Sequence, residues 1–220
     1  MPAAVDHVFI CTASGAPGAE RLRQFGLVEG SPNIHPGQGT ACRRFFFQNA
    51  MLELLWVHDA VEAQSDQTRR TMLWERWSGA GDTTSPFGII LRPPPETQEA
   101  CPFLSWQYRP ASMPELALHI ADGTSPEEPM WCYMETGRGP KDAPPERRQP
   151  LEHPSGFREI TGVRIVSPSL QETSITHAMT RSGVIRSTTG PEHLLELEFD
   201  GVRREKRMDF RPNLPLVFSW

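Results

Sequence analysis

The first 57 residues carry apolar runs in an order that few folds accommodate. Residues 5–12 (VDHVFICT) are β-branched and aromatic and end at a Ser-Gly and Pro-Gly turn, which is typical of a strand. Residues 19–27 place apolar side chains at helical spacing. Residues 27–35 open as a strand, and 43–47 and 51–57 are apolar enough to pair as a hairpin. The order predicted is therefore strand, helix and three strands.

The middle of the chain continues with short segments separated by prolines. Residues 59–77 are predicted as a helix with one buried side. Four further strands are predicted at 87–91, 103–108, 116–120 and 130–134. Residues 138–154 are rich in proline and charge, which predicts an exposed, mobile loop.

The last third of the sequence has predicted elements in an order similar to that of the first third. A strand at 160–166 precedes a helix at 170–181 and a strand at 194–199, whose LLELEF parallels MLELLW at 51–56. Such an echo predicts an internal duplication. We expect one domain with an N-terminal module at 1–80, a β-rich middle segment at 81–136, a Pro-rich loop at 137–155 and a C-terminal module at 156–220.

Composition narrows the class of partner. With 220 residues the chain can bury a real core, and its formal net charge of −5 gives no general attraction to phosphate backbones. Neither nucleic acid nor membrane is therefore expected as a partner. The sequence contains no apolar run of bilayer-spanning length and no basic N-terminal region followed by an apolar stretch, so we expect a cytoplasmic protein. The four cysteines lack metal or disulfide spacing and are interpreted as buried or semi-buried thiols.

Three motifs together carry a resemblance to a known family. They are Asp6-His7-Val8 on the first strand, His35-Pro36-Gly37-Gln38-Gly39-Thr40 in the next turn and Leu52-Glu53-Leu54 on the fourth strand. With them, the chain resembles the glyoxalase-like proteins of the vicinal oxygen chelate superfamily. The resemblance implies an α+β fold, in which paired βαβββ modules form curved mixed sheets around an open cleft.

The resemblance also implies a divalent metal held by the first and last strands of each module. His7 and Glu53 match these positions in the first module, and Glu196 matches the last-strand carboxylate of the second. Gly162 stands where a fourth ligand is expected. One imidazole and two carboxylates suit Fe, Mn, Co, Ni or Zn, and the fourth position is open to water or indicates that no metal binds.

Further residues are candidates for contact with a substrate. The resemblance places the turn of His35 and Thr40 at the mouth of the cleft, and Arg43 or its neighbour Arg44 would bind a substrate carboxylate. A structural role for these residues remains the alternative, since the turn glycines permit tight backbone angles with or without a ligand. Glu196, if it is not a metal ligand, is the candidate catalytic base.

Two functions follow from the resemblance. The first is a metal-dependent lyase, isomerase or dioxygenase acting on a small oxygenated metabolite through an enediolate-type intermediate that the metal stabilises. The alternative is a metal-free module that binds a small molecule in the same cleft, with Trp56, Trp106 and Trp131 among its walls. The assembly expected, where one forms, is a homodimer.

Overall fold

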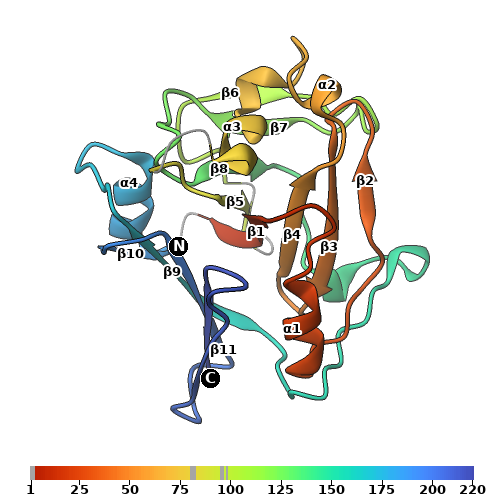
Figure 1. The fold of residues 1–220 in the computed structure, drawn as a ribbon, viewed down its shortest axis with the longest axis vertical. Coiled ribbons are helices and arrows are strands. Elements are labelled where there is room, and N and C mark those ends of the chain that lie inside the picture. The colour runs from red at the N-terminus through yellow and green to blue at the C-terminus, as the bar shows by residue number, and fades with distance from the viewer. Residues whose placement is uncertain (1–2, 80–82, 95–96, 98) are drawn as a thin grey trace.

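Two mixed β-sheets and a few short helices make up the computed structural model, which describes residues 3–79, 83–94, 97 and 99–220 (Figure 1). The large sheet has eight strands. In spatial order they are β2 (Asn33–His35), β3 (Thr40–Phe46), β4 (Met51–Val57), β1 (Ala4–Cys11), β5 (Phe87–Arg92), β8 (Met130–Met134), β7 (Leu118–Ala121) and β6 (Ser105–Tyr108). The predicted α+β class with curved mixed sheets is confirmed.

The large sheet consists of two halves with the same strand order. β1 pairs parallel with β4 in one half, and β5 pairs parallel with β8 in the other. The halves join where β1 and β5 run antiparallel. The first half contains α1 (Ala19–Gln24) between its first two strands and so forms the predicted βαβββ module.

The location of the second module differs from the sequence prediction. The pattern predicts it at 156–220, but β5 to β8 supply the second half of the large sheet. No helix lies among the described residues between β5 and β6, which hides the repeat in the sequence. The similarity between 51–56 and 194–199 does not mark a second module of the large sheet, because β11 belongs to the other sheet.

The C-terminal third forms the second sheet, seen as the blue strands at the lower left of Figure 1. Its strands, in spatial order, are β10 (Arg186–Thr189), β9 (Ile160–Ser167), β11 (Leu194–Phe199), β13 (Leu216–Ser219) and β12 (Arg207–Asp209). The helix α4 (Ile175–Arg181) connects β9 to β10. Ser174 caps this helix by accepting a hydrogen bond from the His177 backbone N–H.

Successive side chains of β1 point to opposite faces of the sheet and enter two different apolar clusters. Val8 and Ile10 enter the main core, to which the second sheet contributes Leu195 and Phe218. Phe9 enters a smaller apolar cluster with Leu55 and Ile90. Because successive strand residues face opposite sides, one face of the large sheet packs in the main core and the other is left to line a cleft.

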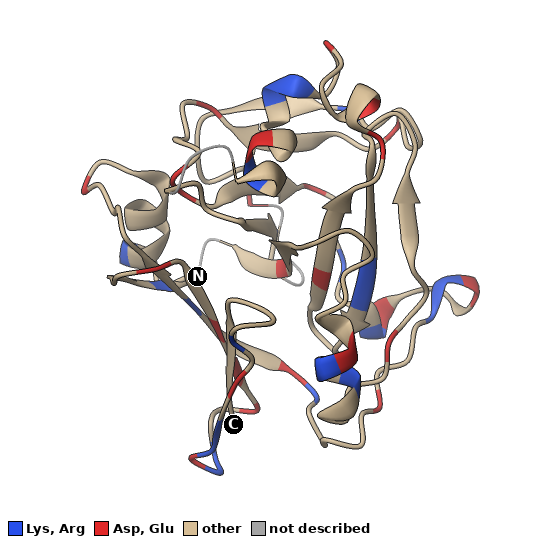
Figure 2. Ribbon diagram, in the orientation of Figure 1, with Lys and Arg blue, Asp and Glu red and all other residues tan. Residues whose placement is uncertain are grey.

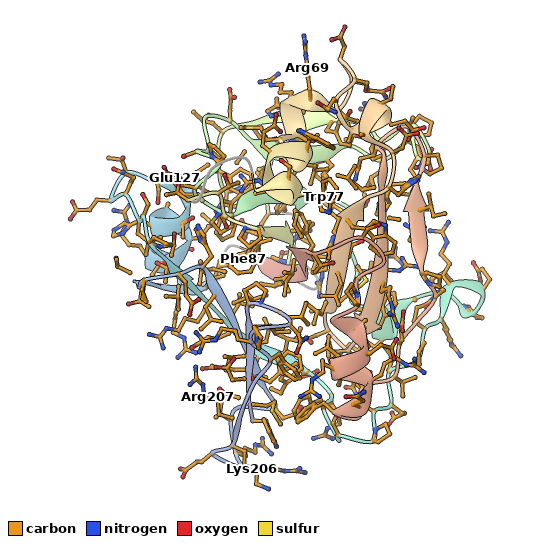
Figure 3. All side chains as sticks on the ribbon, in the orientation of Figure 1. Arg69, Trp77, Phe87, Glu127, Lys206 and Arg207 are labelled. Carbon is orange, nitrogen blue, oxygen red and sulfur yellow. The ribbon has the colours of Figure 1, made fainter. Side chains whose placement is uncertain are left out.

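The predicted helix at 59–77 is broken into three short pieces. These are α2 (Ala60–Ala63), the 3-10 turn η1 (Arg69–Thr71) and α3 (Leu73–Ser78). Met72 has a left-handed backbone with φ of 57°, which ends η1 and prevents a continuous helix. Trp77 (labelled in Figure 3) donates from Nε1 to the Thr12 carbonyl at 2.8 Å and so ties α3 to the end of β1.

The Pro-rich segment is exposed at most positions, as predicted, but it is also anchored to the body. It contains the 3-10 turns η2 (Pro140–Asp142) and η3 (Pro145–Arg147). The Lys141 N–H donates to the Gln48 carbonyl at 3.0 Å, and Gln149 accepts from the Ser31 N–H at 2.9 Å. Buried His153 closes the segment by bonding to the Val28 N–H and the Phe46 carbonyl.

Charged residues of both signs are distributed over the elements of both sheets in Figure 2. Within the described part of the chain, no helix has the length and apolar character needed to cross a bilayer.

Candidate metal centre in the cleft

The cleft face of the large sheet surrounds a cavity of about 210 Å³. Strands from both halves of the sheet line this cavity, together with the segments around η1 and Pro110. Most of its polar lining comes from the first module, namely His7, Asn33, His35, Gln38, Arg44 and Glu53, and Thr71 and Tyr108 add hydroxyl groups. The two halves of the cleft therefore differ in chemistry.

Glu53 is buried, with 6% of its surface exposed, and it lies between two imidazoles. Its Oε2 is 3.9 Å from His7 Nε2, and its Oε1 is 3.9 Å from His35 Nε2. The parallel pairing of β1 and β4 explains the first contact, because it brings His7 and Glu53 to adjacent strands on the same face. The expected placement of these two side chains in one concavity is confirmed.

Each imidazole is held through its other nitrogen. His7 Nδ1 lies 2.7 Å from Asp6 Oδ1, and His35 Nδ1 lies 2.9 Å from the Thr40 hydroxyl. Gln38 donates to the same hydroxyl at 2.8 Å. Both Nε2 atoms are thereby directed toward Glu53, the orientation that partners of metal-binding histidines usually enforce.

The two imidazoles differ in proton affinity. Burial lowers the pKa of His7, but the hydrogen bond with Asp6 and the charges of Asp6 and Glu53 outweigh it, so that the pKa is raised on balance. At His35 burial dominates, and the pKa lies below its usual value. The His7 imidazole therefore holds a proton more readily than the His35 imidazole.

Cys42 completes a group that sequence reasoning missed. Donor atoms of His35, Cys42 and Glu53 all lie within 4.8 Å of one another, so these three residues could hold a metal ion. Burial, followed by the nearby Glu53 charge, raises the Cys42 pKa, so its thiol is protonated at neutral pH. Cys42 could have been found from the alternation of side chains along β3, because this alternation places Cys42 on the same face as Thr40.

Arg43 and Arg44 are neighbours on β3, so their side chains point to opposite faces of the sheet. Arg44 lines the cleft, and its Nε donates to the Ser31 carbonyl at 2.9 Å. Arg43, the predicted substrate ligand, instead bonds to Glu29 at 2.6 Å and to Glu20 at 2.8 Å. Arg43 therefore faces away from the cleft, and Arg44 takes the place expected for it.

Glu196 does not join His7 and Glu53. It lies on β11 in the second sheet and pairs with Arg164 at 3.3 Å and with Arg207 (labelled in Figure 3) at 3.0 Å. Gly162, on the neighbouring strand, is covered by the side chain of Glu198. Because the second sheet does not line this cavity, Glu196 is placed neither as a metal ligand nor as a base there.

The second half of the cleft is apolar. Its strands contribute Ile90, Met130, Cys132 and Met134, and the segment after β6 adds Met113 and Leu116. Tyr108 adds a hydroxyl that is buried and has no hydrogen-bond partner among the described residues. Burial raises the pKa of this phenol to about 12.

None of the three tryptophans expected as walls lines this cavity. Trp131 is fully buried and donates to the Thr176 hydroxyl at 3.0 Å, and Trp56 packs against the main core. Trp106 lines a second, neighbouring cavity.

Three residues of the cleft, His35, Cys42 and Glu53, could together hold a metal ion. His7 lies beside this group, with its Nε2 3.9 Å from Glu53 Oε2. Glu53 supplies negative charge at a buried position, where an uncompensated carboxylate would be unfavourable. The residues present could therefore hold a metal ion, with Cys42 as one of its ligands.

Comparison with known proteins supports the fold only. No family model and no curated protein matches the chain. A solved structure, described as a hypothetical protein from Staphylococcus aureus, is similar to it with a TM-score of 0.51 and 10% sequence identity. The similarity covers 99% of each chain.

Proposed function

We propose that this protein is a glyoxalase-like metalloenzyme of the vicinal oxygen chelate type, which binds a divalent transition metal through His7, His35 and Glu53. Its substrate would be a small oxygenated metabolite, and the reaction a lyase, isomerase or dioxygenase reaction. The observation that carries the proposal is the buried Glu53 carboxylate, which lies 3.9 Å from an Nε2 atom on either side.

The residues around this centre have separate roles in the proposal. A bound divalent metal supplies Lewis acidity toward substrate oxygens. Asp6 and Thr40 fix the orientations of the two imidazoles. Arg44, which lines the same cavity, would bind an anionic group of the substrate. The apolar half around Ile90 and Met130 would hold the non-polar part of the substrate and exclude water.

A metal-free binding module is the second candidate. The observation that favours it is the apolar character of the cleft-facing positions on β5 and β8, the strands that correspond to β1 and β4. Ile90 has no donor atom and Met130 offers only a soft thioether, so the imidazole and carboxylate donors all come from one module. In this alternative, His7 and Glu53 would bind a polar ligand directly.

Metal-dependent thermal stability distinguishes the two candidates. An ion at about 100 times its dissociation constant stabilises the folded state by roughly 2.7 kcal/mol. For a chain of this size this corresponds to an increase in Tm on the order of 5 to 10 °C. We expect such an increase with at least one of Fe, Mn, Co, Ni or Zn, and its reversal by a chelator.

Substitutions show which residues the metal-dependent increase in Tm requires. Glu53→Gln preserves shape but weakens the ligand, so most of the increase should disappear, and His35→Asn should also reduce it. Glu196→Gln is the matched control, because Glu196 is paired with arginines in the second sheet. Identical melting curves with metal and with chelator, for every ion in the series, would leave the metal-free module as the better account.

A further inference from the structure

A cavity of about 440 Å³ lies under the Pro-rich segment. Residues 138–149 supply most of its lining, and Phe46 of β3 and Met51 of β4 contribute from the large sheet. The segment lies beside the end of β3, where the Lys141 N–H donates to the Gln48 carbonyl (blue-green in Figure 1). We call this space the outer cavity. Its volume lies within the range of roughly 300 to 1,000 Å³ that is usual for small-molecule sites, and the cleft alone is smaller.

The outer cavity adjoins the cleft. Met51 lines both spaces. Arg44, which lines the cleft, has its guanidinium carbon 5.2 Å from the centre of the Phe46 ring, which lines the outer cavity. Asp6 lines the outer cavity and contacts His7 of the cleft at 2.7 Å. A single elongated molecule could therefore occupy both spaces.

Three arginines surround this space without a carboxylate partner among the described residues. Arg138 and Arg147 line the outer cavity. Arg44 donates to the carbonyls of Ser31 and Pro32 and to the Ser31 hydroxyl, which are all neutral acceptors. The ion pairs of arginine within the described part of the chain all involve other arginines. The charges of these three side chains are therefore available to a ligand.

The three guanidinium groups are also accessible. Arg138 and Arg147 are exposed, and Arg44 is partly exposed. A guanidinium group binds the oxygens of a carboxylate or phosphate through paired N–H donors. The outer cavity therefore offers cationic donors that a bound oxyanion can reach.

Acidic side chains do not cancel this positive charge. Two acids, Asp6 and Asp142, are in the lining. Asp6 is already compensated, because its Oδ2 is 3.4 Å from Arg92 Nε and its Oδ1 contacts His7. The three arginines therefore outnumber the one remaining carboxylate, in a chain whose formal net charge is −5. A cationic cavity in an anionic protein raises the local concentration of anions.

Apolar side chains cover a further part of the lining. They belong to Phe46, Met51, Pro140, Ala143 and Pro144. An apolar wall beside a few charged groups is usual in sites for organic molecules. A bare inorganic ion would leave this apolar surface in contact with water. The lining therefore favours an anionic group attached to an apolar body.

We infer that the outer cavity binds an organic anion, whose phosphate or carboxylate group accepts from Arg138 and Arg147. Arg44 adds positive charge on the side of the cleft. Because the two spaces adjoin, the natural occupant is the anionic end of an elongated substrate whose other end lies in the cleft. That last step rests on the proposed function, whereas binding of the anion itself requires no metal.

Calorimetric titration of metal-free protein tests the site. The probes are phenyl phosphate and benzoate, which carry the two classes of anion on the same ring, and benzyl alcohol is their neutral counterpart. Ionic strength is held constant with chloride, because salt screens exposed charges. We expect saturable binding of at least one anion and roughly tenfold weaker binding of the alcohol. An absence of saturable binding by both anions, or equal binding of the alcohol, overturns the inference.

Arg147 and Arg148 provide a matched pair of variants. Both are exposed, but only Arg147 lines the outer cavity. Arg147→Gln should weaken binding of the anion on the order of fivefold, the upper range for one exposed ion pair, and Arg148→Gln should leave it unchanged. The double variant Arg138→Gln/Arg147→Gln should lose most of the binding. Equal affinities of Arg147→Gln, Arg148→Gln and wild type would place the anion elsewhere and contradict the inference.

A longer probe tests the link to the cleft. 4-Phenylbutyrate carries the same carboxylate as benzoate on a longer apolar body, so it should bind more tightly if that body reaches past Met51 into the cleft. Binding no tighter than that of benzoate would overturn the assignment of the occupant as an elongated substrate. Anion binding that depends on Arg147, in a protein whose Tm responds to no metal, would retain the outer cavity and reject the metalloenzyme. A metal-dependent Tm without anion binding would reject the outer cavity alone.

Discussion

The carboxylate of Asp6 lies 2.7 Å from Nδ1 of His7, the next residue in the chain. Neighbours on a regular strand point to opposite faces, but the β1–β5 pairing contains an irregularity between Val5 and His7. Asp6 Oδ2 is also 3.4 Å from Arg92 Nε, which holds the carboxylate from β5. Residues at the junction between the two halves of the sheet thereby orient His7.

Asp6→Asn tests this relationship. The amide preserves shape but removes the charge that orients His7 and raises its pKa. We expect metal affinity to fall by roughly 10- to 100-fold, as for other second-layer carboxylates. Competition with a chromophoric chelator measures the change. Asp66→Asn, at an exposed position beside Arg69, is the control, and equal affinity in the two variants would contradict a positioning role for Asp6.

Tyr108→Phe should not destabilise the protein. The hydroxyl has no partner among the described residues, so its removal loses no hydrogen bond and leaves the ring in place. We expect an unfolding free energy equal to that of wild type or up to about 1 kcal/mol higher. Tyr133→Phe is the comparison, because the Tyr133 hydroxyl donates to the Glu99 carbonyl, and its loss should cost about 1 kcal/mol. Urea denaturation measures both, and a larger loss at Tyr108 would reveal a bound partner.

Gly88→Ala should disturb the cleft. A Cβ at Gly88 would lie 2.0 Å from the Phe9 ring, which lines the cavity. Relieving this clash requires a ring or backbone shift that costs about 1 to 3 kcal/mol. Gly162→Ala is the comparison, because its Cβ would meet the flexible carboxylate of Glu198. Calorimetry should show the larger decrease in Tm for Gly88→Ala, and equal decreases would contradict the packing described.

The cysteines should react slowly in the folded protein. Burial raises the pKa of Cys11 and of Cys132 to about 12, and it also raises those of Cys42 and Cys101. Because the thiolate is the reactive form, little of it exists at neutral pH. Titration with a chromogenic disulfide should therefore be slow without denaturant and should reach four thiols rapidly in guanidinium chloride. A fast-reacting thiol in native protein would contradict this arrangement.

The first module was predictable because its signals are local. A strand, a helix and three strands are visible in 57 residues. The resemblance implied that His7 and Glu53 share a site, and the β1–β4 register places them on one face. His35 was also found from its turn, although the structure places it beside Glu53 as a further donor. Arg43 and Arg44 could not be separated without the register of β3.

The sequence by itself determined the α+β class and the elements of the first module, since these depend on local patterns, and the resemblance to glyoxalase-like proteins associated His7 with Glu53. Only the tertiary structure decided that β5 to β8, and not residues 156–220, complete the large sheet. That choice excluded Glu196 from the cleft and brought in Tyr108. A strand pairs with strands distant in sequence according to how the faces of the two sheets pack together. The weak similarity of LLELEF to an earlier strand therefore does not show which sheet it joins.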